Sequence, residues 1–274
     1  MSDVHEFQLG AFRCWIVSDG ERTVDDPFRS GFVNATDDEM RAEVEAYTAA
    51  TGDPANVVGM NILIVETGDN RVIVDTGDGS TSDRGYGNLL DRLPQTGLSI
   101  ADIDTVIITH GHGDHIAACT NGSGVPSFPN AQYVISQLDW DHWTTEPGET
   151  ASTHLLAIAD RFDRIAPDAE ILPGIRAIPA PGHTPGQIAL LIESNGEQLL
   201  HIADAWHHPV ELPRPDWYFS FDWNPDQTVA TRRTLLDMAT RDNLLVLPYH
   251  ATFPGLGHVV ADGDAWQWRP RRDG

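Results

Sequence analysis

The sequence predicts an α/β protein in which two β-sheets pack together with helices on the outside. Short apolar runs rich in Val, Ile and Leu alternate with stretches of helical periodicity, and strands followed by a helix recur in both halves. No Gly/Ser-rich linker or low-complexity tract divides the 274 residues. We therefore expect a single domain over residues 1–274. Periodicity alone leaves one doubly wound sheet as the alternative.

Strands are expected where short runs are rich in β-branched and apolar residues. These runs cover residues 12–17, 61–66, 71–75, 105–109, 133–136, 175–179, 188–193, 199–203 and 244–247. Residues 62–66 and 71–75 flank the turn sequence Thr67-Gly68-Asp69-Asn70, which is typical of a β-hairpin.

Helix starts are recognisable at two places. Thr36 and Glu39 have the spacing of a capping box ahead of a helix over residues 40–50. Asn224 followed by Pro225 begins a helix that runs to about residue 241, with proline at its first position. Further helices are expected over residues 86–93, 137–143 and 153–162.

The composition excludes several classes of function. Asp and Glu total 41 against 17 Lys and Arg, all of them arginine, so the net charge is −24. A surface this acidic repels polyanions, and nucleic acid is not an expected partner. No run approaches the roughly 20 apolar residues of a membrane span, and the first ten residues lack the apolar core of a secretory signal. We expect a cytoplasmic protein with no membrane partner and, since Cys14 and Cys119 lie in different segments, no disulfide framework.

Metal-ligating side chains are concentrated directly after the expected strand 105–109. Residues 109–115 read Thr-His-Gly-His-Gly-Asp-His and thus deliver His110, His112, Asp114 and His115 within six residues. The two glycines let the backbone turn tightly enough for these side chains to converge. Imidazole and carboxylate suit zinc, and also iron, manganese or cobalt. A solvated histidine-rich loop is the alternative, which the position after a buried strand disfavours.

Three later segments also place a ligand-type side chain just after an apolar strand. His183 lies in the turn Pro-Gly-His-Thr-Pro-Gly over residues 181–186, Asp204 ends the run 199–203, and His250 follows the run 244–247. Each of them alone is more typical of an ordinary turn residue. Together with the 109–115 loop they indicate more ligands than one tetrahedral ion uses.

In their order along the chain, these motifs resemble the metallo-β-lactamase-fold hydrolases, whose early Asp-Thr-Gly turn matches residues 75–77. The resemblance implies an αββα sandwich of two mixed β-sheets with two divalent metal ions at one edge of the sheets. Zinc is the expected metal, with iron, manganese or cobalt as alternatives. It assigns the ligands as His110, His112 and His183 on one ion, Asp114, His115 and His250 on the other, and Asp204 between them. Asp75 would orient a ligand from behind; a role as a turn cap is the alternative.

Within the family, the sequence is most similar to the methyl-parathion hydrolases and quorum-quenching lactonases. The runs at residues 128–133 and 253–258, and the pair Asp139-Trp140, carry this similarity. An Asp204 that is shared between the two metal ions disfavours the true β-lactamases, whose metal shells typically lack such a residue. The absence of lysine disfavours them as well, because a lysine often anchors the lactam carboxylate. It also disfavours the glyoxalase-type thioesterases, which use cations to bind glutathione. His112 stands where the flavin-linked di-iron reductases have Glu, and the acidic surface disfavours the nuclease branch.

Two residues are candidates for a direct catalytic role. Asp114 can hold or shuttle a proton beside the metals. Lactonases of this branch usually carry Tyr three residues after the bridging Asp, whereas phosphotriesterase-like members carry His; here the position is His207. Lactone specificity would then need Tyr218 or Tyr249 as a substitute.

An aromatic-rich stretch follows Asp204 and is expected to form a loop beside the metals. Trp206, Trp217, Tyr218 and Phe219 are the residues predicted to wall an apolar acyl or aryl pocket. Core packing or a homodimer interface is an equally supported reading of the same residues.

The sequence as a whole predicts a binuclear metal-dependent hydrolase of small apolar esters, lactones or phosphotriesters, with a metal-bridging hydroxide as nucleophile. A mono-iron dioxygenase or other redox enzyme on the same fold is the alternative. Two zinc-like ions per chain favour the hydrolase, and one iron favours the dioxygenase. The expected partners are a small-molecule substrate and a second copy of the chain.

Overall fold

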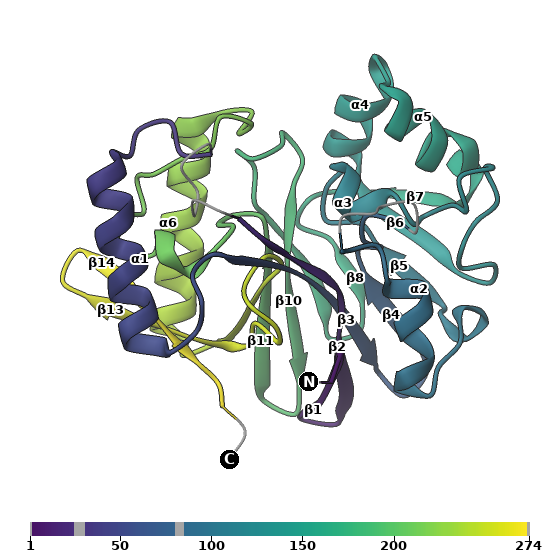
Figure 1. The fold of residues 1–274 in the computed structure, drawn as a ribbon. Helices are drawn as coiled ribbons and strands as arrows, with labels where there is room; N and C mark the ends of the chain where they lie inside the picture. Colours follow the sequence, from purple (N-terminus) through teal and green to yellow (C-terminus); the bar gives the residue numbers. More distant parts are fainter. Residues whose placement is uncertain (1, 25–30, 80–84, 273–274) are drawn as a thin grey trace.

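Two β-sheets packed face to face form the centre of the molecule (Figure 1). A computed structural model describes residues 2–24, 31–79 and 85–272, and within them each sheet has seven strands. The N-terminal sheet contains, in spatial order, β1 (Val4–Leu9), β2 (Phe12–Thr23), β3 (Val57–Glu66), β4 (Arg71–Val74), β5 (Thr105–Ile107), β6 (Gln132–Ser136) and β7 (Phe162–Ile165). The C-terminal sheet contains β14 (Ala265–Pro270), β13 (Gly257–Asp262), β12 (Leu245–Pro248), β11 (Glu197–Ala203), β10 (Ile188–Ser194), β9 (Ile175–Pro179) and β8 (Glu170–Leu172).

Both sheets are mixed. Strands β1 to β4 pair antiparallel, and β4 to β7 pair in parallel. In the other sheet β11 and β12 pair in parallel and the remaining pairs are antiparallel. The carboxyl ends of β4 and β5, and those of β11 and β12, therefore meet at common sheet edges. The loops that leave these edges carry the residues of the site described below.

The helices cover the two outer faces, which completes an αββα sandwich (Figure 1). Helices α1 (Asp37–Thr51) and α6 (Pro225–Arg241) pack on the C-terminal sheet. Helices α2 (Leu89–Arg92), α3 (Gly113–Ile116), α4 (Gln137–Thr145) and α5 (Glu149–His154) lie on the side of the N-terminal sheet. None of the described helices has both the length and the apolar character that a membrane crossing demands.

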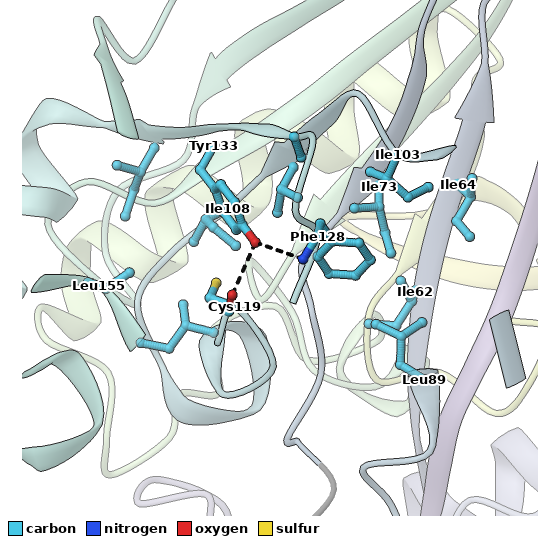
Figure 2. Close-up of a cluster of buried hydrophobic side chains, with 14 of the residues drawn as sticks. Ile62, Ile64, Ile73, Leu89, Ile103, Ile108, Cys119, Phe128, Tyr133 and Leu155 are labelled. Atoms are coloured by element: carbon cyan, nitrogen blue, oxygen red, sulfur yellow. Dashed lines mark hydrogen bonds between the residues drawn. The ribbon is translucent and has the colours of Figure 1, made fainter. Parts of the chain in front are cut away.

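Alternation along the strands separates three apolar clusters. In β3, Ile62 and Ile64 face the helices of the N-terminal half, whereas Leu63 and Val65 face the space between the sheets. Figure 2 shows the first of these clusters, where the hydroxyl of Tyr133 accepts a hydrogen bond from the Phe128 amide (3.3 Å) and donates one to the Cys119 carbonyl (3.1 Å). A buried phenol is tolerated there because both of its hydrogen-bonding functions are used.

Several predicted elements agree with the structure. The capping box of Thr36 and Glu39 is confirmed at the start of α1, and Asn224 caps α6, whose first residue is Pro225. The hairpin between β3 and β4 is confirmed as well, closed by the Thr67 amide on the Asn70 carbonyl at 2.9 Å.

Two predicted helices were wrong in extent. The helix over residues 86–93 is only the short α2 followed by a 3₁₀ turn, because the buried carboxylate of Asp19 binds the amides of Gly87 and Leu89 and holds residue 87 outside the helix. The helix over residues 153–162 is replaced by the end of α5 and a 3₁₀ segment, Leu156–Arg161. Phe162 then opens β7, where it pairs with Tyr133.

Candidate metal centre

The loop after β5 is built to point several side chains to one place. Thr109 is fixed by Asp75, whose Oδ1 accepts from the Thr109 amide and whose Oδ2 accepts from its hydroxyl, both at 2.8 Å. The amide of Gly111 donates to Asp139 Oδ2 at 2.7 Å. A Cβ on residue 111 would lie 2.4 Å from the ring of Trp143, so glycine is required for this close approach. His110 and His115, on either side of this turn, are both buried.

Ring nitrogens of three histidines converge on one point. His112 Nδ1 lies 3.0 Å from His110 Nε2 and 2.8 Å from His183 Nε2. His183 comes from the turn after β9, so the group joins the two sheets. Three imidazole nitrogens at this spacing match the donor set of one zinc-type ion.

A second group forms next to the first. His115, His250 and Asp114 bring one ligand atom each to a common place, with Asp114 Oδ2 3.5 Å from His250 Nε2. Oδ2 of Asp204 stands between the groups: it lies 3.6 Å from His183 Nε2, 3.4 Å from His115 Nε2 and 3.3 Å from His250 Nε2. The structure thus brings together every residue expected to ligate, and Asp204 occupies the shared position.

The outer nitrogens of these imidazoles have partners of their own. His115 Nδ1 lies 2.8 Å from Asp75 Oδ2, His183 Nδ1 lies 2.8 Å from Asp222 Oδ1, and His250 Nδ1 lies 3.0 Å from the Gly59 carbonyl. Such contacts fix the tautomer and direct the other ring nitrogen to a metal. Within the described residues, His115 Nε2 and Asp204 Oδ1 are buried with no hydrogen-bond partner. Two divalent ions fit this set of donors, because they would satisfy both atoms.

The electrostatics of the cluster differ between its ligands. Burial alone would lower the pKa of His115 and His250, but the carboxylate of Asp204 reverses the effect and raises both, whereas His110, His112 and Asp204 are shifted towards their metal-binding forms. Burial lowers the pKa of His110 well below its ordinary value, assisted by charge on His115, and lowers that of His112 to about 4, assisted by His183. Burial alone would raise the pKa of Asp204, but His250 and His115 reverse the effect and lower it well below its ordinary range. A neutral imidazole and an ionised carboxylate are the forms that bind a metal.

A cavity of about 470 Å³ opens over the cluster. His112, Asp114, His183, Asp204, His207 and His250 reach into it. Its walls are largely apolar and include Val58, Met60, Phe219 and Phe221, with Arg22 among the remaining lining residues.

The pocket prediction needs correction for three of its four residues. Of the described residues that line the cavity, Phe219 is one, but Trp206, Trp217 and Tyr218 are not. Trp206 and Trp217 are buried in the apolar cluster between α6 and the C-terminal sheet. Phe221 lines the cavity instead, with its ring 4.9 Å from that of Phe219. Aromatic content marked the right segment, but it does not reveal which rings turn inward.

His207 faces the cavity beside Asp204. Its Nε2 lies 3.7 Å from Asp204 Oδ2, its ring centre lies 4.2 Å from that of Phe219, and neither ring nitrogen has a hydrogen-bond partner among the described residues. Burial lowers its pKa well below the ordinary value, so the ring is neutral at pH 7. Glu211 Oε1 holds its backbone by accepting from the amides of His207 (2.7 Å) and His208 (2.9 Å).

Comparison with known proteins identifies this architecture. The model of the metallo-beta-lactamase superfamily matches residues 55–250, and the chain belongs to that superfamily. It is a metal-dependent hydrolase of the superfamily, with relatives and structural neighbours among metallo-hydrolases and lactonases. Both the predicted family and the predicted sandwich of two mixed sheets are confirmed.

The similar proteins are distant in sequence. An N-acyl homoserine lactonase of Bacillus thuringiensis is 25% identical over 211 residues, which are 68% of this chain and 79% of the lactonase. A probable metallo-hydrolase of Mycobacterium tuberculosis is 25% identical over 54% of this chain and 57% of its own length. The solved structure of AidC, a dizinc quorum-quenching lactonase in complex with the product N-hexanoyl-L-homoserine, superimposes with a TM-score of 0.88 at 26% identity, covering 100% of this chain and 99% of AidC.

Proposed function

We propose that the chain hydrolyses small, largely apolar esters, lactones or phosphotriesters at a centre of two divalent metal ions, with zinc as the preferred metal. The observation that carries the proposal is the pair of adjacent ligand groups joined by Asp204 at the base of an apolar-walled cavity. One tetrahedral ion leaves several of these ligands unused, whereas two ions use them all.

When bound, two such ions would lower the pKa of water towards neutrality, so that it can attack at pH 7, and would polarise the carbonyl or phosphoryl oxygen of the substrate. The residues of the chain do the rest. Asp204 and the histidines hold the centre in place, and Asp114, whose side chain is 28% exposed at the cavity, can accept a proton from the attacking water or return one to the leaving group. His207 lies where a neutral N–H can donate to a substrate oxygen.

The cavity supports an apolar substrate. Phe219 and Phe221 form one wall and Val58 and Met60 another, so an acyl chain or aryl ring would be desolvated beside the ligands. The lactonase activity of AidC and of the Bacillus thuringiensis protein supports the lactone part of the proposal. His207, at a position where lactonases of this type usually carry Tyr, favours aryl esters over long-chain lactones.

The test measures metal content and substrate range on the same protein. The full chain is stripped with a chelator, reloaded with Zn²⁺, and assayed against a p-nitrophenyl ester, an acyl homoserine lactone and a paraoxon-type triester. We expect activity on at least one class, highest on the ester, that reaches its maximum at two metals per chain. The exposed His142→Gln serves as a control that should not change activity.

Three outcomes would contradict the proposal in whole or in part. The first is full activity with one metal or none per chain. The second is a single iron per chain with consumption of oxygen, which would establish the redox alternative. Absence of turnover on all three substrate classes at full metal loading would leave the metal centre intact but overturn the substrate assignment.

A further inference from the structure

One buried carboxylate connects the metal centre to the aromatic wall of the cavity. Asp222 Oδ1 lies 2.8 Å from His183 Nδ1, and both side chains are fully buried. The other oxygen, Oδ2, accepts a hydrogen bond from the Phe219 amide at 2.9 Å. A single side chain thus contacts a ligand on one side and the backbone of the substrate wall on the other.

Both partners of Asp222 are hydrogen-bond donors. A backbone amide such as that of Phe219 can only donate, and His183 must carry its proton on Nδ1 when Nε2 faces a metal. Only an ionised carboxylate presents two acceptors in this geometry. Asparagine has the same shape but would turn its NH₂ group, a donor, towards one of the two donors.

The surrounding backbone strengthens the connection. The Trp223 amide donates to the His183 carbonyl at 3.1 Å, and the Asn224 amide donates to the Gly182 carbonyl at 2.9 Å. The segment 219–224 is therefore tied to the turn that carries the ligand. The ring of Phe221 lies over this junction, 5.6 Å from the His183 ring and 5.2 Å from the His207 ring.

We propose that Asp222 is a positioning residue that couples the affinity of one metal ion to the shape of the substrate wall. It orients His183, and with it the site formed by His110, His112 and His183. It also fixes Phe219 and Phe221 in the positions from which their side chains contact an acyl or aryl group of the substrate. Loss of one carboxylate oxygen should disturb both functions, whereas the Asp114, His115 and His250 site lies outside its reach. The part that concerns the substrate wall rests on the function proposed above; the part that concerns the metal does not.

The decisive experiment is a zinc titration of the stripped full chain against a chromophoric chelator, which needs no substrate. We expect Asp222→Asn to weaken one of the two zinc dissociation constants by about 10- to 100-fold and to change the other less than twofold. On the reloaded enzyme, the same variant should raise KM for a hexanoyl aryl ester more than for an acetyl aryl ester.

Two variants separate positioning from a general loss of stability. Asp19 is another buried carboxylate, which accepts hydrogen bonds from the amides of Asp78, Gly87 and Leu89 and contacts no metal ligand. Asp19→Asn should therefore lower Tm without weakening one zinc dissociation constant more than the other. Phe221→Ala should change the acyl-length preference and leave both zinc constants as they are. Unchanged zinc constants in Asp222→Asn, or an equal weakening of both as in a merely destabilised protein, would overturn the proposal. If no ester is cleaved but the constants separate as expected, the proposed substrate class fails and the role of Asp222 at the metal stands.

Discussion

The two sheets contribute to the metal centre in different ways. The N-terminal sheet supplies His110, His112, Asp114 and His115 from the single segment that runs from β5 into α3. The C-terminal sheet supplies His183, Asp204 and His250 from three separate strand ends. The first set is aligned by its own short backbone, whereas the second depends on strand register and on partners distant in sequence.

The hydrogen-bond partners that hold the ligand side chains in place also differ between the two halves. Asp75 secures the loop of the N-terminal half through Thr109 and His115. In the C-terminal half the support is distributed: Asp222 holds His183 and the Gly59 carbonyl holds His250. A change in one support should therefore affect the whole loop in the first half and a single ligand in the second.

Removal of a ligand from each half should give the largest effects. His115→Ala and His250→Ala each strip the same ion of one protein ligand, so each should reduce kcat/KM by more than about 100-fold, beyond the usual cost of losing an indirect contact. Elemental analysis should show loss of about one metal per chain in both. Activity above a tenth of the wild-type value with one metal missing would show that the second ion is dispensable.

Asp75→Asn should have the next largest effect. The substitution preserves shape but places a donor against Thr109 or His115, which disturbs the loop at two points. We expect activity to fall about 10- to 100-fold and both zinc constants to weaken together, in contrast to the selective effect expected for Asp222→Asn. Selective weakening in both variants would remove the distinction between the halves.

Acid stability should show a further difference between the halves, because the C-terminal half buries His201 and His208, which lie outside the expected ligand set and, among the described residues, do not line the cavity. Burial lowers the pKa of His201 to about 4 and that of His208 to about 3. Between these values and the ordinary pKa near 6.5, the unfolded chain binds more protons, so stability falls as pH decreases through this window. For each residue, protonation in the unfolded chain should lower the free energy of unfolding by about 2 kcal/mol between pH 7 and pH 5. No such contribution remains above pH 7, where both states are neutral.

Denaturant unfolding of the metal-free chain measures this contribution. Between pH 7 and pH 5, the free energy of unfolding of His201→Leu should fall by about 2 kcal/mol less than that of the wild type. The exposed His142→Gln controls for the loss of one histidine elsewhere in the chain. Equal pH dependence in all three proteins would mean that His201 is not held neutral.

The residues with a local signature were accessible from sequence. The loop at 109–115 and the strand-end positions of His183, Asp204 and His250 are visible because ligand-type residues follow apolar runs. Asp222 has no such signature, since its partner His183 is 39 residues away and its neighbours are aromatic. Trp206 and Phe219 look alike in sequence, and only the packing against α6 decides that the first is in the core.

The same limit applied to the fold. The central strands were predicted because both faces are buried, as in β3 and β11. The outermost strands β1, β7, β8 and β14 were missed, as was β13, because half-exposed strands carry polar residues that dilute the apolar pattern. Tertiary pairing, not local propensity, makes these segments strands.

The smallest expected effect concerns His207 and the choice of substrate. Its neutral ring lies next to both Asp204 and Phe219, where the two halves of the site meet the aromatic wall. A tyrosine there would carry its hydroxyl farther into the cavity and could donate to a lactone oxygen, while Glu211 would still hold the backbone amide. One such hydrogen bond contributes about 0.5–1.5 kcal/mol. His207→Tyr should therefore raise the ratio of lactone to aryl ester kcat/KM by about two- to tenfold.

Metal content decides how a change in that ratio is understood. His207 can also approach an ion, since its ring shares a possible ligand group with His183 and Asp204. We expect two metals per chain in both proteins, which assigns the change in ratio to substrate contact. His142→Tyr, on the exposed face of α4, controls for a new phenol elsewhere on the surface. An unchanged ratio with metals intact would show that His207 takes no part in substrate choice, and loss of a metal would make it a ligand.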